Sequence, residues 1–185
     1  YFISKDFNNF NCKCYIEFVD TGQENNTGKR LELIESYIPK KDNFFLCNYC
    51  DGLANVNLVS LILEHHNNEN IGTLTTVKPI NQFGILQFDS LGNVIRFIEK
   101  PRMSEFINGG FFVFNKKVFD YIEIEKNQEL EKDILVKLAN NKQLGSYYHD
   151  GFWETLNTVK DEVNLNNIYN ECIKNNKELE WLRIE

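Results

Sequence analysis

An apolar run from Phe44 to Tyr49 stops at the dipeptide Asp51–Gly52. A short apolar run bounded by turn residues is typical of a strand that is buried on both faces of a sheet. In open α/β sheets, ligands bind beyond the carboxyl ends of the strands. The sequence therefore predicts that Asp51 lies at a ligand site, where its carboxylate suits Mg²⁺, a cation that prefers oxygen ligands. An ordinary turn is the alternative, because Asp and Gly are common turn residues.

The rest of the chain alternates between two hydrophobic periods. Thr27 is the predicted N-cap of a helix that stops at Pro39. Asn55 is the predicted N-cap of a second helix, which has Val59 and Leu63 on its apolar face. Further helices are expected at 118–122, 130–138 and 159–176, and strands at 14–19, 44–49, 73–77, 83–88, 94–98, 107–115 and 143–149. Helices and strands alternate early and strands cluster later, so we expect an α/β sheet with an antiparallel insertion.

Composition narrows the function classes. The 185 residues are 42% hydrophobic and carry a net charge of -7. This length fits one domain, and the acidity argues against nucleic acid or an anionic membrane as partner. There is no apolar stretch of about 20 residues and no signal-peptide pattern in the sequence. The odd cysteine count, with Cys47 and Cys50 on opposite strand faces, favours reduced cysteines in a cytoplasmic protein over disulfides or zinc.

Several polar residues at the ends of predicted strands are candidate ligand groups. In FIEKPR, Glu99 suits sugar hydroxyls and Lys100 suits a phosphate, although an exposed Glu–Lys pair is also common on surfaces. Gly84 in QFGIL allows a close backbone approach to a ligand. Asn108 in INGG both donates and accepts hydrogen bonds, and Asn157 follows an aromatic pair in GFWETLNT. Each feature is weak alone.

Together, these segments resemble a known family. Their order resembles that of the sugar-1-phosphate nucleotidyltransferases, and they are most similar to the glucose-1-phosphate cytidylyltransferase type of that family. The segments are VDTG…TGKRL, CDGLANV, QFGIL, FIEKPR, INGGFFVFN, LEKDILVKLA and HDGFWETLNTVKD. The resemblance implies a Rossmann-like nucleotidyltransferase fold with an antiparallel sugar-binding insertion. It also implies transfer from CTP to glucose 1-phosphate, which gives CDP-glucose and pyrophosphate, with Mg²⁺ as cofactor and a homo-oligomer as the assembly.

The resemblance also implies site residues. Asp51 and Asn157 match metal-binding positions, and Lys100 matches a phosphate-binding lysine that acts in catalysis together with Asp51. Matching substrate-binding positions are Gly84, Glu99, Asn108 and Gly109 for the sugar, and Arg30 near the nucleotide. The three histidines, His65, His66 and His149, have no implied role and are expected to be structural or surface residues.

The sequence departs from the family pattern at several positions. No glycine-rich phosphate loop occurs in residues 1–30, and the chain begins at Tyr1, so we expect 1–185 to be a partial domain without its first strands. Asn157 replaces an aspartate, Gln82 an arginine and Cys50 a glycine. These changes leave open a non-catalytic relative that binds sugar phosphates or nucleotide sugars. A glycosyltransferase is a third possibility, but its Asp-x-Asp signature is absent.

Overall fold

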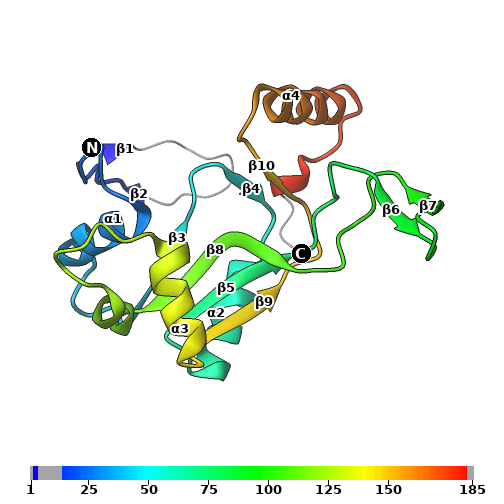
Figure 1. The fold of residues 1–185 in the computed structure, drawn as a ribbon. Coiled ribbons are helices and arrows are strands. Elements are labelled where there is room, and N and C mark those ends of the chain that lie inside the picture. The colour runs from blue at the N-terminus through cyan, green and yellow to red at the C-terminus, as the bar shows by residue number, and fades with distance from the viewer. Residues whose placement is uncertain (1, 4–13, 183–185) are drawn as a thin grey trace.

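The computed structural model describes residues 2–3 and 14–182, and Figure 1 shows their arrangement. The strands are β1 (Phe2–Ile3), β2 (Cys14–Tyr15), β3 (Phe44–Asn48), β4 (Gly52–Ala54), β5 (Gly72–Val77), β6 (Ile85–Phe88), β7 (Val94–Ile98), β8 (Ile107–Asn115), β9 (Leu144–Tyr148) and β10 (Trp153–Thr155). The α-helices are α1 (Thr27–Leu33), α2 (Leu58–Asn68), α3 (Val136–Asn140) and α4 (Val159–Lys174). Short 3₁₀ turns η1 (Glu35–Tyr37), η2 (Lys116–Tyr121) and η4 (Glu180–Leu182), and the π-helix η3 (Leu130–Leu135), complete the fold.

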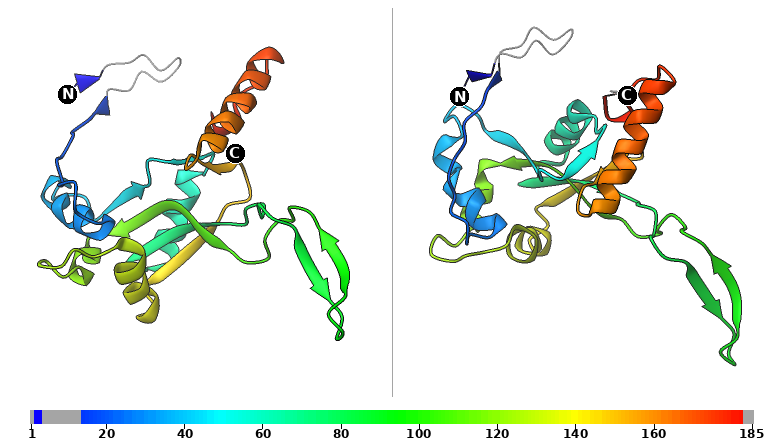
Figure 2. Two further views of the ribbon diagram at one scale, coloured as in Figure 1. Left: turned by 45° about the horizontal axis from the view of Figure 1, so that its top comes forward. Right: turned by 90° about the horizontal axis from the view of Figure 1, so that it is seen from above.

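The centre of the molecule is a four-stranded sheet in the order β3-β8-β5-β9. β8 runs antiparallel to β3 and β5, whereas β5 and β9 are parallel. β3, β5 and β9 therefore end at the same edge of the sheet, where β8 begins. In Figure 2, α2 lies on one face of this sheet and α3 on the other. Helices on both faces of a mixed sheet confirm the predicted α/β class.

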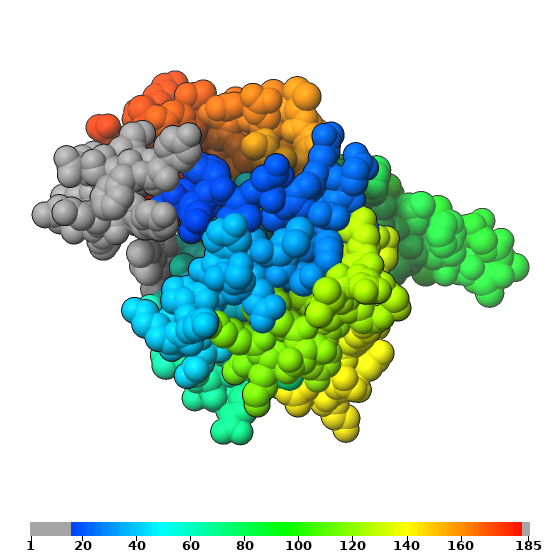
Figure 3. Space-filling view, turned by 90° about the vertical axis from the view of Figure 1, so that its left-hand side faces the viewer, coloured from blue at the N-terminus to red at the C-terminus, as the bar shows by residue number. Residues whose placement is uncertain are grey.

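The hydrophobic core fills the space between one sheet face and the helices α1, η3 and α3. The apolar residues at its centre come from all of these elements, and they are Leu31, Phe112, Phe114, Val118, Ile122, Leu130, Ile134, Leu135 and Leu138. Gly28 allows α1 to lie close to the backbone at Gln128, because a Cβ at position 28 would lie 2.8 Å from the Gln128 carbonyl oxygen. Figure 3 shows this side of the molecule, with residues 16–38 packed against the segment around residue 130.

Two smaller strand pairs extend from the sheet. β4 pairs antiparallel with β10, and β6 pairs antiparallel with β7. The predicted hairpin turn is confirmed: the Asp89 carboxylate accepts hydrogen bonds from the backbone N–H groups of Leu91 and Asn93, and Gly92 has φ of 86°. The β6–β7 hairpin projects away from the body in both views of Figure 2. Every residue of β6 and four of the five in β7 are exposed.

Most predicted strands occur close to their expected positions, but both predicted helix caps are wrong. Asn26 is the N-cap of α1, and the Thr27 hydroxyl instead bonds to the segment 130–131. Asn57, rather than Asn55, caps α2 through Ser60 N–H. The pairing of β4 with β10 keeps the chain extended through Ala54, so the helix begins later than the sequence predicts.

The predicted buried face of α2 is also wrong. Leu61 and His65 are buried, whereas Val59 is 68% and Leu63 56% exposed. His65 packs inward because its ring Nδ1 lies 2.9 Å from the hydroxyl of buried Thr73 on β5. Local periodicity alone did not distinguish the two faces, because Leu61 and the pair Val59 and Leu63 give this helix apolar residues on two nearly opposite sides.

The cysteines agree with the prediction of free thiols. Cys47, Cys50 and Cys172 form no disulfide, and burial raises the pKa of the Cys47 thiol. Cys12 and the side chain of Cys14 lie outside the described residues. Among the helices that the structure describes, none has the length and apolar character needed to cross a membrane.

Two of the three leucines of α2 provide a test of its orientation. Leu61→Ala should destabilise the chain by about 2–5 kcal/mol, because it leaves a cavity under a fully buried side chain. Leu63→Ala, on the same helix but 56% exposed, should change stability by less than about 1 kcal/mol. Urea unfolding followed by circular dichroism measures both, and equal losses would contradict the observed helix face.

Candidate active site

The edge where β3, β5 and β9 end carries most of the predicted site residues. Asp51 follows β3, and Asn108 and Gly109 lie at the start of β8, which runs in the opposite direction. Because strands of opposite direction bring one carboxyl end and one amino end together, these residues meet at one edge. The prediction that Asp51 lies beyond the carboxyl end of a strand is confirmed.

A cavity of about 350 Å³, hereafter the acid cavity, opens at this edge. It brings together four predicted residues, Asp51, Asn108, Gly109 and Asn157, with five others: Tyr49, Gly52, Glu131, Trp153 and Thr155. Tyr49 and Glu131 had no predicted role, although Glu131 lies in the quoted run LEKDILVKLA. No local pattern marks them, because they meet only through a long-range contact between η3 and the residue that follows β3.

The pairing of β4 with β10 places Asn157 beside Asp51. Thr155 pairs with Gly52, and the next residue, Leu156, donates its backbone N–H to the Asp51 carbonyl at 2.9 Å. Asn157 then precedes α4, whose first turn is closed by a capping box between Thr158 and Asp161. The indole N–H of Trp153 donates to the Gly109 carbonyl at 2.8 Å and fixes this strand pair to β8.

A second cavity, of about 590 Å³, shares Trp153 and Thr155 with the first. We call it the lysine cavity, because Lys78, Lys100, Arg102 and Lys160 line it, together with Gln82 and buried His149. Four acidic residues also line it: Asp150, Glu154, Asp161 and Glu180. Arg102 is paired with Asp150 at 2.7 Å, and Glu154 has a raised pKa because of burial and the nearby Asp161. The lysine cavity is thus a mixed site in which Lys78, Lys100 and Lys160 add positive charge.

The backbone of Lys100 is strained. Four described non-glycine residues have positive φ, and three of them, Glu69, Lys142 and Asn176, lie just after helices. Lys100, with φ of 45°, instead follows β7 and precedes Pro101. A left-handed conformation is unfavourable for residues with a Cβ, and such strain persists where the surrounding structure enforces it, often at functional sites.

Three predicted residues line neither cavity. The Glu99 side chain is 62% exposed and lies 4.0 Å from the Lys100 ammonium group. Gly84 lies beside it at the base of the hairpin, where a Cβ would come within 3.2 Å of a Glu99 oxygen. The Arg30 guanidinium is bound to the preceding loop, through Thr21, Gln23 and Asn25.

The donor atoms of the acid cavity fit Mg²⁺. In the described residues, no group of three or more His, Cys, Asp or Glu side chains is arranged to hold a metal. Asp51 and Asn157 nevertheless offer a carboxylate and an amide oxygen to one cavity. Mg²⁺ is often held by one or two protein oxygens, with water and substrate phosphates as its other ligands. Two such ligands are therefore sufficient for a shared site.

Comparisons with known proteins identify the family. The nucleotidyl transferase family pattern matches residues 4–171. A Bacillus subtilis protein named "Probable glucose-1-phosphate cytidylyltransferase" is 38% identical over 156 residues, and a Salmonella typhi glucose-1-phosphate cytidylyltransferase is 36% identical over 155. These matches cover 84% and 83% of this chain but 60% and 59% of the relatives, so the chain spans about three fifths of their length.

A solved structure shares the fold. HddC from Yersinia pseudotuberculosis superposes with a TM-score of 0.53 at 18% identity, over 80% of this chain and 62% of the other. The Rossmann-like nucleotidyltransferase fold expected from the sequence is confirmed. Because its family pattern matches residues 4–171, this chain belongs to the nucleotidyl transferase family.

Proposed function

We propose that this chain takes part in nucleotidyl transfer from CTP to glucose 1-phosphate, which gives CDP-glucose and pyrophosphate. The observation that carries the proposal is the acid cavity, where Asp51, Asn108 and Asn157 meet beside the cavity that contains Lys100. The names of the relatives support the substrate class. The proposal includes CTP as the nucleotide, glucose 1-phosphate as the sugar phosphate and Mg²⁺ as the cofactor. It also includes a homo-oligomer in the cytoplasm as the assembly.

The reaction requires positioning and charge neutralisation rather than covalent help from the protein. An oxygen of the sugar phosphate attacks the α-phosphorus of the triphosphate, and pyrophosphate leaves in line. Asp51 and Asn157 would hold Mg²⁺, which supplies positive charge for the phosphate oxygens when it is bound. Lys100 would neutralise the phosphate of the sugar as a point charge.

The sugar would be held by the residues at the start of β8. The Asn108 amide donates and accepts hydrogen bonds, so it suits sugar hydroxyls, and Gly109 leaves room for the ring. Glu99 and Gly84 would act from the base of the hairpin, beyond the two cavities. Arg30 would act on the nucleotide only after release from the three loop groups that now bind it.

A sugar-phosphate binding protein without turnover is the second candidate. It is favoured because, among the described residues, the acid cavity offers a metal one available carboxylate, Asp51, whereas the Glu131 carboxylate is bound to Tyr49 and Thr27. One carboxylate holds Mg²⁺ less tightly than two. Incubation with CTP, glucose 1-phosphate and Mg²⁺ separates the candidates, because only the enzyme releases pyrophosphate.

Substitutions at the two oxygen ligands should change Mg²⁺ affinity in opposite directions. Asp51→Asn should weaken the Mg²⁺-dependent binding of CDP-glucose at least tenfold, because it removes the acid-cavity carboxylate that is not held by another described side chain. Asn157→Asp should strengthen Mg²⁺ binding about tenfold, because it adds a second negative charge to the site. Isothermal titration with and without Mg²⁺ measures both, with exposed Asp120→Asn as the matched control. Unchanged Mg²⁺ dependence in both variants would contradict this metal site.

Lys100→Gly should separate stability from binding. Glycine removes the left-handed strain of about 1 kcal/mol, so the melting temperature should hold or rise. Loss of the ammonium group should weaken binding of glucose 1-phosphate at least tenfold. Lys142→Gly is the control, because its φ of 56° gives the same relief at a turn that lines neither cavity. If both variants bind as the wild type does, Lys100 is not a phosphate ligand.

A further inference from the structure

A chain of hydrogen bonds borders the acid cavity and ends on Asn108. The Tyr49 hydroxyl donates to one carboxylate oxygen of Glu131 and accepts an N–H of the Asn108 amide at 3.2 Å. The amide oxygen of Asn108 accepts the backbone N–H of Gly110 at 3.0 Å. These two contacts fix which end of the amide is nitrogen and which is oxygen. One N–H and one oxygen lone pair of the amide are left for a ligand.

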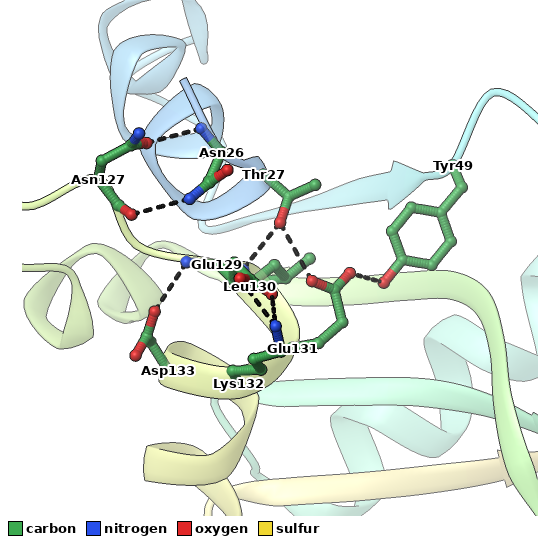
Figure 4. A network of polar contacts seen from close by, with 9 residues as sticks. All are labelled: Asn26, Thr27, Tyr49, Asn127, Glu129, Leu130, Glu131, Lys132 and Asp133. Carbon is green, nitrogen blue, oxygen red and sulfur yellow. Dashed lines mark hydrogen bonds and ion pairs between the residues drawn. The ribbon is translucent and has the colours of Figure 1, made fainter. Parts of the chain in front are cut away.

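The second oxygen of Glu131 anchors the chain on the other side. It accepts the Thr27 hydroxyl at 3.1 Å, and that hydroxyl accepts the backbone N–H of Leu130 at 2.9 Å. Figure 4 shows Glu131 between Thr27 and Tyr49. Both hydroxyls donate to the carboxylate, one to each of its oxygens.

The ring of Tyr49 is held against β8. Gly110 has φ of 86°, and a Cβ at this position would lie 2.6 Å from the Tyr49 ring. On another side, the ring meets Phe112 edge-on, with 5.5 Å between the ring centroids. The glycine thus allows the ring to lie close to the backbone, and the packing prevents the hydroxyl from swinging away from Asn108.

We propose that Tyr49 and Glu131 are positioning residues, which hold the Asn108 amide so that its remaining N–H and lone pair meet a hydroxyl of the bound sugar. This inference rests on the proposed function, because it assumes a sugar phosphate in the acid cavity. It adds to that function two residues for which the family resemblance implied no role. Through Thr27, it also connects the sugar site to the first residue of α1.

Titration with two ligands tests the proposal. Tyr49→Phe should weaken glucose 1-phosphate binding about tenfold and leave the binding of inorganic phosphate unchanged, because phosphate lacks the sugar hydroxyls. Glu131→Leu should behave like Tyr49→Phe, whereas Glu131→Gln should recover most of the affinity, since its amide oxygen still accepts from Tyr49. Tyr148→Phe is the matched control, because this tyrosine also donates to a carboxylate, Asp150, but lines neither cavity.

A purely structural role would give a different pattern. Tyr49→Phe would then lower the melting temperature and weaken both ligands equally, and this result would overturn the proposal. Unchanged affinity for glucose 1-phosphate in Tyr49→Phe would overturn it too, provided that the wild type binds. The proposed function would stand in either case, because it depends on the wild type and on Asp51.

A measurement without ligand keeps the two proposals separate. The side-chain amide signals of Asn108, assigned by their loss in Asn108→Asp, are followed by ¹⁵N NMR. Their hydrogen exchange should speed up at least tenfold in Tyr49→Phe and not in Tyr148→Phe. Equal exchange in Tyr49→Phe and the wild type would overturn the positioning role. If the wild type binds no sugar phosphate but the exchange responds as expected, the proposed function fails and the positioning of Asn108 stands.

Discussion

The pairing of β4 with β10 is the contact on which the candidate site depends. These strands are three residues each, yet they join two parts of the chain that are far apart in the sequence. The hydrogen bond from Leu156 to the Asp51 carbonyl and the bond from the Trp153 indole to the Gly109 carbonyl fix this pair to the segment after β3 and to the start of β8. This pairing is therefore what brings Asp51 and Asn157 into one cavity.

The sequence predicted the parts of the fold whose signals are local. β8 has the predicted bounds, and β3 and β7 were correctly located, because each is a clear apolar or β-branched run between turn residues. Asp51 was found by its place after a strand. β4 and β10 were missed because Gly-Leu-Ala and Trp-Glu-Thr are too short for an alternating pattern, and their pairing is purely long-range. The error at Asn55 follows from that omission.

The candidate site likewise combines residues that the sequence revealed with residues that only a long-range contact brings in. Asp51 was found from its position after a strand, the resemblance gave roles to Asn108, Gly109 and Asn157, and the fold brings all four together. Glu131 and Tyr49 could not be found in this way, because their significance lies in a contact between η3 and the residue that follows β3, and neither segment shows it alone. The net charge of -7 did not predict the lysine cavity, where three lysines and an arginine gather together with four acidic residues. Global charge describes long-range attraction, whereas a phosphate site depends on a few nearby cations.

The projecting β6–β7 hairpin has a consequence for local unfolding. An isolated two-stranded hairpin is at best marginally stable in water, and this one buries little of its surface against the body. Its amide protons should therefore exchange early, through an opening that leaves the core intact. The base of the hairpin is held separately, by the hydrogen bonds from Asn81 to Pro101 and from Met103 to Pro79. The tip can thus open and close while Lys100, anchored at that base, keeps its place in the lysine cavity.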